Sequence, residues 1–171
     1  MRYLVTIIFL SLVTGCSSYE PPTPRMVEKS TVIEASAEAV WDAVVRYFAE
    51  RNIPIENMDH SSFFIKTQPV NLSHVHGGGK IPLKNAWCDC GTPKLRNVWS
   101  TTHHIFFAFN ILLDGRAPKA TAATINVFFN GKKLGKRNLY APGYDVEVPL
   151  QCISTGKFEQ DLLAYLIRAS T

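Results

Sequence analysis

The sequence predicts an α+β domain in which two helices pack on one face of an antiparallel sheet of about five to six strands. Two helical apolar patterns stand near the ends of the domain, and between them apolar residues alternate with a period of two. Strands that follow one another as hairpins pair antiparallel, whereas parallel strands would need longer crossovers. The 171-residue chain, 46% hydrophobic and 19% charged, is long enough to bury one core.

The first fifteen residues have the layout of a secretory signal peptide. Arg2 precedes an apolar segment, Leu4–Leu12, which is too short for a transmembrane helix of about 20 residues. The ending Val13–Cys16, Val-Thr-Gly-Cys, resembles the lipobox of bacterial lipoproteins. That resemblance implies cleavage before Cys16, a diacylglyceryl group on its thiol and an acyl chain such as palmitate on its amine. The alternative is an ordinary signal peptide followed by a coincidental cysteine.

The chain is therefore expected to have three parts. Residues 1–15 form the signal peptide, and residues 16–25 form the lipidated Cys16 and a tether. Ser17–Arg25 contains three prolines and no periodic apolar pattern, which is typical of an extended linker. Residues 26–171 form the single α+β domain.

The domain begins with a strand and a helix. Met26–Ala35 is a candidate strand, and Ser36 is a good N-cap for the helix that follows it. Asn52 is the expected end of this helix, since Pro54 follows two residues later. The apolar side chains share one face of the helix: Val40, Trp41, Val44, Val45 and Phe48.

Two short strands, Ile53–Met58 and Ser62–Thr67, are expected to form a hairpin against this helix. Gln68–Ser100 is the least regular part of the chain, with the Gly77–Gly79 run. Loops longer than about 12–15 residues are usually functional or disordered.

The strongest strand pattern follows this irregular part. Thr101–Leu113 and Ala120–Asn130 both alternate, with Asp114-Gly115 in the connection between them. Asn130-Gly131 predicts a second hairpin turn, after which the chain returns to a last strand at Tyr144–Gln151. Ser154 or Thr155 can then cap a final helix, with its apolar stripe at Phe158, Leu162, Tyr165 and Leu166.

A few apolar side chains fall on the strand face opposite the main apolar set. Phe106, Phe128 and Leu112 have this position. If helices cover only one face, these side chains form an exposed patch suited to a partner or an acyl chain. The simpler expectation is a sheet covered on both sides, with the long loop over the second face.

Charge is unevenly distributed along the chain. Residues 19–65 contain eight acidic and four basic side chains, whereas residues 66–137 contain eleven basic side chains and only Asp89 and Asp114 opposing them. A basic flank suits anionic lipid headgroups or an acidic protein, but it can also be a set of solvated lysines. No nucleic-acid partner is expected for an exported, lipid-anchored chain.

The sequence predicts no catalytic residue, no metal site and no cofactor. A Gly-x-Ser-x-Gly motif is absent, and the Gly77–Lys80 stretch lacks the spacing of a phosphate loop. Paired carboxylates are scarce where a cleft could form. The candidate metal ligands lack matched pair spacing, and an oxidising compartment competes for the thiols. These candidate ligands are His74, His76, Cys88, Cys90, His103 and His104.

In an oxidising compartment, two of the three cysteines after Cys16 can form a disulfide. Cys88 and Cys90 are too close in sequence for an unstrained bond to one another. Either one is therefore a candidate to pair with Cys152, which leaves one free thiol.

Four blocks of sequence resemble a family of bacterial outer-membrane lipoproteins. The blocks are Ser36–Ile55, Phe64–Thr67, Asp89–Gly91 and Cys152–Glu159. The layout of this family is similar to the repeated helix-grip domain of BamC, an accessory of the β-barrel assembly machinery. BamC has two such domains, and this chain has room for one.

The resemblance implies a helix-grip fold, a disulfide between Cys90 and Cys152, and a binding or scaffolding role without catalysis. We therefore expect a non-enzymatic protein, anchored by Cys16 in the outer membrane and facing the periplasm, that binds another envelope protein. The family pattern associates an Asp after the lipidated cysteine with inner-membrane retention, and this chain has Ser17. The alternative function is a carrier for an apolar ligand or lipid in the helix-grip groove.

Overall fold

The computed structural model describes residues 19–75, 82–94, 98, 100–137, 143–144 and 146–170. Within these residues, seven strands form the main sheet and two longer helices pack against it. In chain order the elements are β1 (Tyr19–Glu20), β2 (Ser30–Ile33), α2 (Ala37–Arg51), β3 (Ile55–Asp59), β4 (Phe64–Thr67), β5 (Val70–Asn71), α3 (Leu72–Val75), β6 (Cys88–Asp89), β7 (Thr92–Pro93), β8 (Ser100–Ala117), β9 (Ala120–Lys136), β10 (Val146–Gln151), β11 (Ile153–Ser154) and α4 (Lys157–Ser170).

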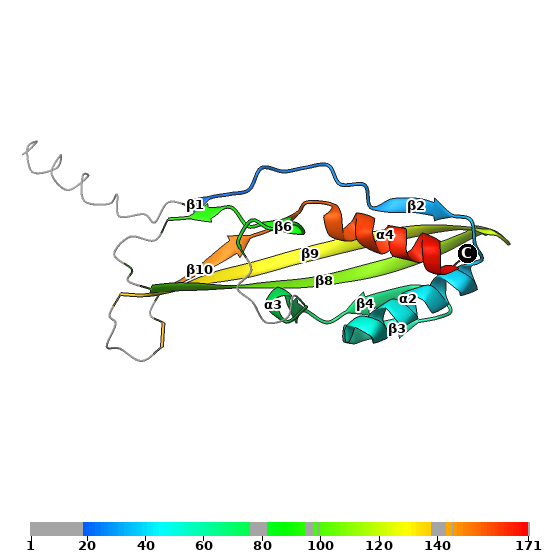
Figure 1. The fold of residues 1–171 in the computed structure, drawn as a ribbon, viewed down its shortest axis with the longest axis horizontal. Coiled ribbons are helices and arrows are strands. Elements are labelled where there is room, and N and C mark those ends of the chain that lie inside the picture. Colours follow the sequence, from blue (N-terminus) through cyan, green and yellow to red (C-terminus); the bar gives the residue numbers. More distant parts are fainter. Residues whose placement is uncertain are drawn as a thin grey trace, which may run out of the picture.

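A long hairpin of β8 and β9 runs through the centre of the sheet (Figure 1). The outer edge of β9 pairs first with β2 and further along with β10. The outer edge of β8 pairs with β4 and β5, and β3 pairs with β4. Every strand pair in the described residues is antiparallel, so the predicted α+β class is confirmed.

Helix α2 starts and ends where the sequence predicts. The Ser36 hydroxyl accepts a hydrogen bond from the Ala39 N–H at 3.3 Å, which satisfies one unpaired donor of the first turn. Asn52 adopts the left-handed conformation, with φ of 51°, and ends the helix. The buried apolar stripe includes Val40, Val44 and Phe48, as the 3.6-residue spacing requires.

Both long helices cover the same face of the sheet. The ring of Phe109, on β8, has its centroid 5.4 Å from that of Phe48 in α2 and 4.9 Å from that of Phe158 in α4. These three rings are almost completely buried. The core therefore lies between the two helices and one face of the β8–β9 hairpin.

The hairpin turn expected at Asn130-Gly131 is wrong. Strand β9 continues through these residues to Lys136, and the hairpin turns at Pro118-Lys119, beyond the expected Asp114-Gly115 connection. Gly131 lies within β9, where neighbouring chains approach closely, and not in a turn. A Cβ atom there would lie 3.2 Å from the His104 carbonyl oxygen and 3.3 Å from the Cys152 sulfur.

Two further segments differ from the sequence-based expectation. The first strand of the domain is shorter than Met26–Ala35, because only Ser30–Ile33 pairs with β9. The irregular region Gln68–Ser100 contains the short elements β5, α3, β6 and β7, while Gly77–Gly79 lies outside the described residues.

Part of the expected tether packs on the domain. Tyr19 and Glu20 pair with Pro93 and Thr92 as strands β1 and β7. The Tyr19 hydroxyl lies 2.9 Å from the carbonyl oxygen of Gln151 and accepts a hydrogen bond from the N–H of the same residue at 3.1 Å. Cys16 lies outside the described residues, three positions before Tyr19.

Candidate binding surface

The sheet face opposite the helices carries exposed apolar side chains. Side chains alternate between the two faces of a strand, so Leu112 on β8 and Phe128 on β9 point away from the helix-covered core. Phe128 is 59% exposed and Leu112 is 46% exposed. The expectation that the long loop covers this face is wrong for these two side chains. Phe106, on the same face, is half-buried.

Polar side chains divide this apolar surface. The Asn126 side-chain amide donates to the Asn110 side-chain oxygen at 3.0 Å, in the row between Leu112 and Phe128. The cross-strand bond fixes both amides on the sheet. An apolar surface with fixed polar groups is typical of a site that binds a partner. We call the face that carries Leu112, Phe128, Asn110 and Asn126 the open face.

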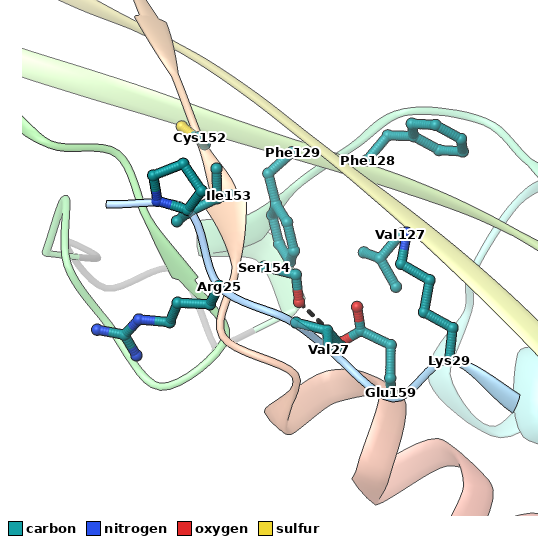
Figure 2. Close-up of a pocket in the computed structure, with 11 residues that line it drawn as sticks. Arg25, Val27, Lys29, Val127, Phe128, Phe129, Cys152, Ile153, Ser154 and Glu159 are labelled. Atoms are coloured by element: carbon teal, nitrogen blue, oxygen red, sulfur yellow. Dashed lines mark hydrogen bonds between the residues drawn. The ribbon is translucent and has the colours of Figure 1, made fainter. Parts of the chain in front are cut away.

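A pocket of about 290 Å³ lies at the outer edge of β9, next to Phe128 (Figure 2). It falls between the part of β9 that pairs with β2 and the part that pairs with β10. Its walls come from the N-terminal segment 24–29, from β9, and from the β11–α4 region. The residues that line it include Val27, Lys29, Val127, Phe129, Ile153 and Glu159.

Glu159 is a buried acid at this pocket. Its side chain has no exposed area, and the Ser154 hydroxyl donates to its Oε2 atom at 2.8 Å. The Oε1 atom is buried and has no hydrogen-bond partner among the described residues. Glu159 stands in the first turn of α4, where a carboxylate is favourable for the helix dipole. The unpartnered oxygen is not explained by that role, because a buried polar atom normally has a partner.

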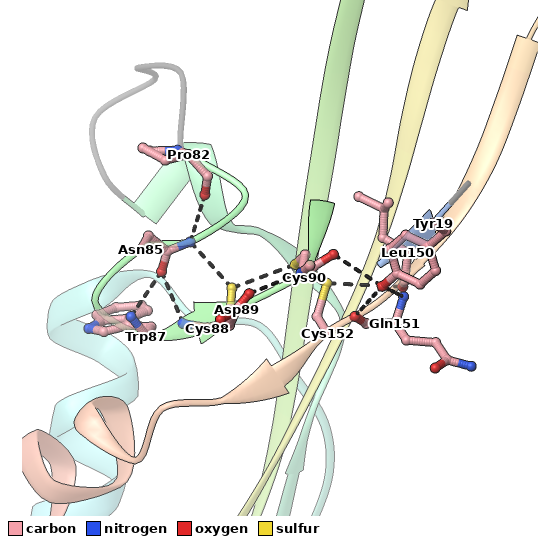
Figure 3. The surroundings of a disulfide bond; sticks show 11 residues. Tyr19, Pro82, Asn85, Trp87, Cys88, Asp89, Cys90, Leu150, Gln151 and Cys152 are labelled. Atoms are coloured by element: carbon pink, nitrogen blue, oxygen red, sulfur yellow. Dashed lines mark hydrogen bonds between the residues drawn. A yellow bond between two sulfur atoms is a disulfide. The ribbon is translucent and has the colours of Figure 1, made fainter. Parts of the chain in front are cut away.

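A disulfide joins Cys90 and Cys152, with an S–S distance of 2.04 Å (Figure 3). This is the pairing implied by the resemblance described above. It connects the β6–β7 region to the end of β10, next to Tyr19. The Tyr19 hydroxyl is 3.1 Å from the Cys90 carbonyl oxygen, so the N-terminal segment and the disulfide meet at one place.

Cys88 is the free cysteine of the described residues, and its side chain is buried. Its sulfur lies 3.9 Å from that of Cys90 and 3.3 Å from the Asn85 amide nitrogen. Burial raises the pKa of the Cys88 thiol to about 11, against the smaller opposing effect of the Asn85 hydrogen bond. A thiol with such a pKa is a poor nucleophile at neutral pH.

Basic side chains gather near the end of the sheet that holds Tyr19. The Lys133 amino group donates to the carbonyl oxygen of Pro93, which pairs with Tyr19. Lys132 forms an exposed ion pair with Glu147 at 3.4 Å. Part of the basic region recognised in the sequence therefore lies at the end of the molecule from which the chain leads back toward Cys16.

The described residues contain no group of three His, Cys, Asp or Glu side chains that could hold a metal ion. Of the candidate ligands, His76 lies outside the described residues, and the side chain of His74 is not described. Cys90 is bound in the disulfide, and the Cys88 sulfur accepts a hydrogen bond from the Asn85 side-chain amide.

No described helix is both long enough and apolar enough to cross a membrane. Comparison of the chain with protein-family models gives no match, and comparison with curated proteins gives none either.

The pocket and Glu159 could not be found from the sequence pattern. An acidic residue early in a helix is the ordinary pattern, so Glu159 carries no signal of its own. The exposure of Phe128 and Leu112 had a signal, since both residues break the polar pattern expected on an outward strand face. The sequence pattern did not show whether another segment of the chain covers Phe128 and Leu112.

Proposed function

We propose that this chain is a non-enzymatic, lipid-anchored protein of the bacterial outer membrane that binds another envelope protein through the open face. The observation that carries the proposal is the exposure of Phe128, at 59%, on a sheet face opposite the helices. An exposed aromatic ring beside a fixed pair of amides is typical of the anchor residues in protein interfaces.

The proposed anchor determines how the domain is oriented. Only Ser17 and Ser18 stand between Cys16 and Tyr19, and three residues reach at most about 11 Å when extended. Tyr19 is held on the domain by β7 and by Gln151. The Tyr19 end of the sheet is thus expected next to the bilayer. Lys133 is at the same end, and a basic side chain near an anionic surface contributes about 1 kcal/mol. Lys132 lies there too, but it forms an ion pair with Glu147.

The alternative function, a carrier of an apolar ligand between helices and sheet, has less support. Aromatic rings of Phe48, Phe107, Phe109 and Phe158 pack against one another in that space. A ligand there would have to displace a close-packed core, at a high free-energy cost.

Photo-crosslinking in living cells tests the proposed function. A photoreactive phenylalanine analogue at position 128 or 112 is expected to give one adduct of defined mass, identified by mass spectrometry. The matched control carries the analogue at Asp161, an exposed position of α4, and is expected to give no such adduct. Absence of an adduct at both sheet positions, or the same adduct at Asp161, would contradict the proposal.

A further inference from the structure

The outer edge of β9 is paired along two stretches and leaves a gap between them. Strand β2 pairs with residues 121–124, and β10 pairs with residues 130–135. The Ile125 N–H donates to the Lys29 carbonyl oxygen at 2.7 Å, which extends the first stretch by one bond. Val127 lies in the middle of the gap.

The hydrogen bonds of the neighbouring strand show which way the Val127 backbone points. Its partner across the hairpin, Phe109, directs its own N–H to the Thr67 hydroxyl at 3.0 Å and its carbonyl oxygen to the same group. Phe109 is therefore turned away from β9. In an antiparallel ladder the backbone groups of the residue opposite are then turned outward as well. The N–H and C=O of Val127 thus face the gap, and no backbone hydrogen bond to them is found among the described residues.

The pocket described above occupies this gap. The side chains of Val127, Phe129 and Ile153 supply apolar walls, and Figure 2 shows Glu159 approaching from α4. The N-terminal segment forms another wall, through Val27 and Lys29, and leaves the pocket open between it and β9. The site therefore combines two outward backbone groups, an apolar lining and the unpartnered Oε1 atom of Glu159.

We propose that this gap binds a short extended segment of a partner protein, which pairs with the Val127 backbone and donates a side-chain hydrogen bond to Glu159. Unpaired backbone groups at a sheet edge are the usual template for an added strand, and alternate side chains then give specificity. The Oε1 atom requires a donor, which an Asn side chain supplies. Because Lys29 lines the same pocket, a neutral donor fits better than a second cation.

The size of the pocket limits what can bind. A volume of about 290 Å³ is at the lower end of sites that take small ligands, so the bound segment is a few residues long. The site also adjoins the open face, because Phe128 lines the pocket. This inference rests on the proposed function in one respect, namely that the occupant is a protein.

The test uses two tripeptides added to the full chain in mild detergent. Acetyl-Val-Asn-Val-amide and acetyl-Val-Asp-Val-amide have nearly the same shape, but only the first donates a side-chain hydrogen bond at neutral pH. The amide resonance of Val127 is followed by NMR during each titration. We expect a saturable shift and about tenfold tighter binding of the Asn peptide, because only this peptide supplies the donor that the buried Oε1 atom lacks.

Three variants sharpen the test. Glu159→Gln is expected to reduce the preference for the Asn peptide to less than about threefold, because Gln both donates and accepts. Val27→Trp fills the pocket from an outer wall and is expected to abolish the Val127 shift even if Glu159→Gln folds poorly. Val32→Trp is the matched control, since Val32 is exposed and lies outside the pocket, and it is expected to bind both peptides normally.

Several results would overturn the inference. One is a Val127 resonance that does not respond to either peptide, as expected if the segment 24–29 fills the gap itself. Another is an unchanged Asn preference in Glu159→Gln. A third is a response to dihexanoyl phosphatidylethanolamine without a response to the peptides, which would assign the pocket to a lipid headgroup. Crosslinking from position 128 would be unaffected in all three cases, so failure here is distinguishable from failure of the proposed function.

Discussion

The side-chain hydroxyl of Thr67, the last residue of β4, pairs with the backbone of β8 in the place of a backbone group. It is buried, donates to the Phe109 carbonyl oxygen at 3.3 Å and accepts from the Phe109 N–H at 3.0 Å. Replacing Thr67 with Val keeps the shape and leaves both backbone groups unpaired. We expect Thr67→Val to lower the free energy of unfolding by about 1–3 kcal/mol, measured by urea denaturation.

Thr124→Val is the matched control for this prediction. The Thr124 hydroxyl bonds to the Ser30 hydroxyl at the surface, so its loss is expected to change stability by less than about 0.5 kcal/mol. Equal effects of the two variants would contradict the role assigned to Thr67.

The burial of Cys88 predicts how its reactivity depends on pH. With a pKa of about 11, the folded thiol should react with iodoacetamide more than about a hundredfold more slowly at pH 7 than after denaturation. If Cys16 carries the proposed lipid, labelling after denaturation should find one free thiol, as measured by mass spectrometry. Three labelled cysteines would contradict the disulfide.

The raised pKa of Cys88 also predicts how the free energy of unfolding changes with pH. An unfolded cysteine ionises near pH 8.5, whereas the folded one stays protonated to about pH 11. The unfolded state therefore binds fewer protons in this range, and the free energy of unfolding falls as pH rises from 8.5 to 11. Below pH 8.5 this contribution is fully present. In a Cys88→Ser variant this part of the pH dependence should disappear.

At the scale of elements, local signals predicted the helices well. A cap at Ser36 and a stop at Asn52 are properties of a few neighbouring residues, and the structure confirms both. The prediction of a turn at Asn130-Gly131 is wrong because an Asn-Gly pair can occur either in a turn or where two chains approach closely. The close approach at Gly131 involves His104 and Cys152, which are distant in sequence. No local pattern carries that information.

The pairing of β1 with the domain was also beyond local reasoning. The Pro-rich composition of Ser17–Arg25 predicts an extended linker. In the described part of this segment, Pro21–Arg25 belong to no helix or strand, whereas Tyr19 and Glu20 form β1. The contacts of Tyr19 depend on the ends of β7 and β10, which come together only in the folded chain.

Tyr19→Phe tests how firmly β1 is attached. Loss of the hydroxyl removes the acceptor for the Gln151 N–H, so we expect amide hydrogen exchange at Gln151 to accelerate by about tenfold. Trypsin cleavage after Arg25 should accelerate in parallel. Tyr144→Phe, which alters an exposed tyrosine, is the control and should change neither rate. An unchanged exchange rate at Gln151 in Tyr19→Phe would contradict the attachment.

At the scale of the whole molecule, the proposed lipid anchor at Cys16 predicts where the protein is found. Two or more acyl chains bind a membrane stably, whereas one binds it only marginally. We expect Cys16→Ser to appear as an uncleaved precursor or as a soluble protein when membranes are separated by ultracentrifugation. Cys88→Ser, with the lipobox intact, should stay with the membranes. Normal membrane fractionation of Cys16→Ser would contradict the proposed anchor.

Strand β9 is paired with β8 along one edge, and with β2 and β10 along two separate stretches of the other edge. Because of this pairing, the number of residues in β9 matters as much as the identity of its buried side chains. Deleting Asn126 or Val127 would exchange the inward and outward side chains of the part of β9 that follows the deletion. Phe128 would turn into the core, and the pairing with β10 would lose its register. Insertions and deletions should therefore be tolerated at the Pro118-Lys119 tip and excluded from the strand, which a scan of single-residue deletions along the hairpin can measure.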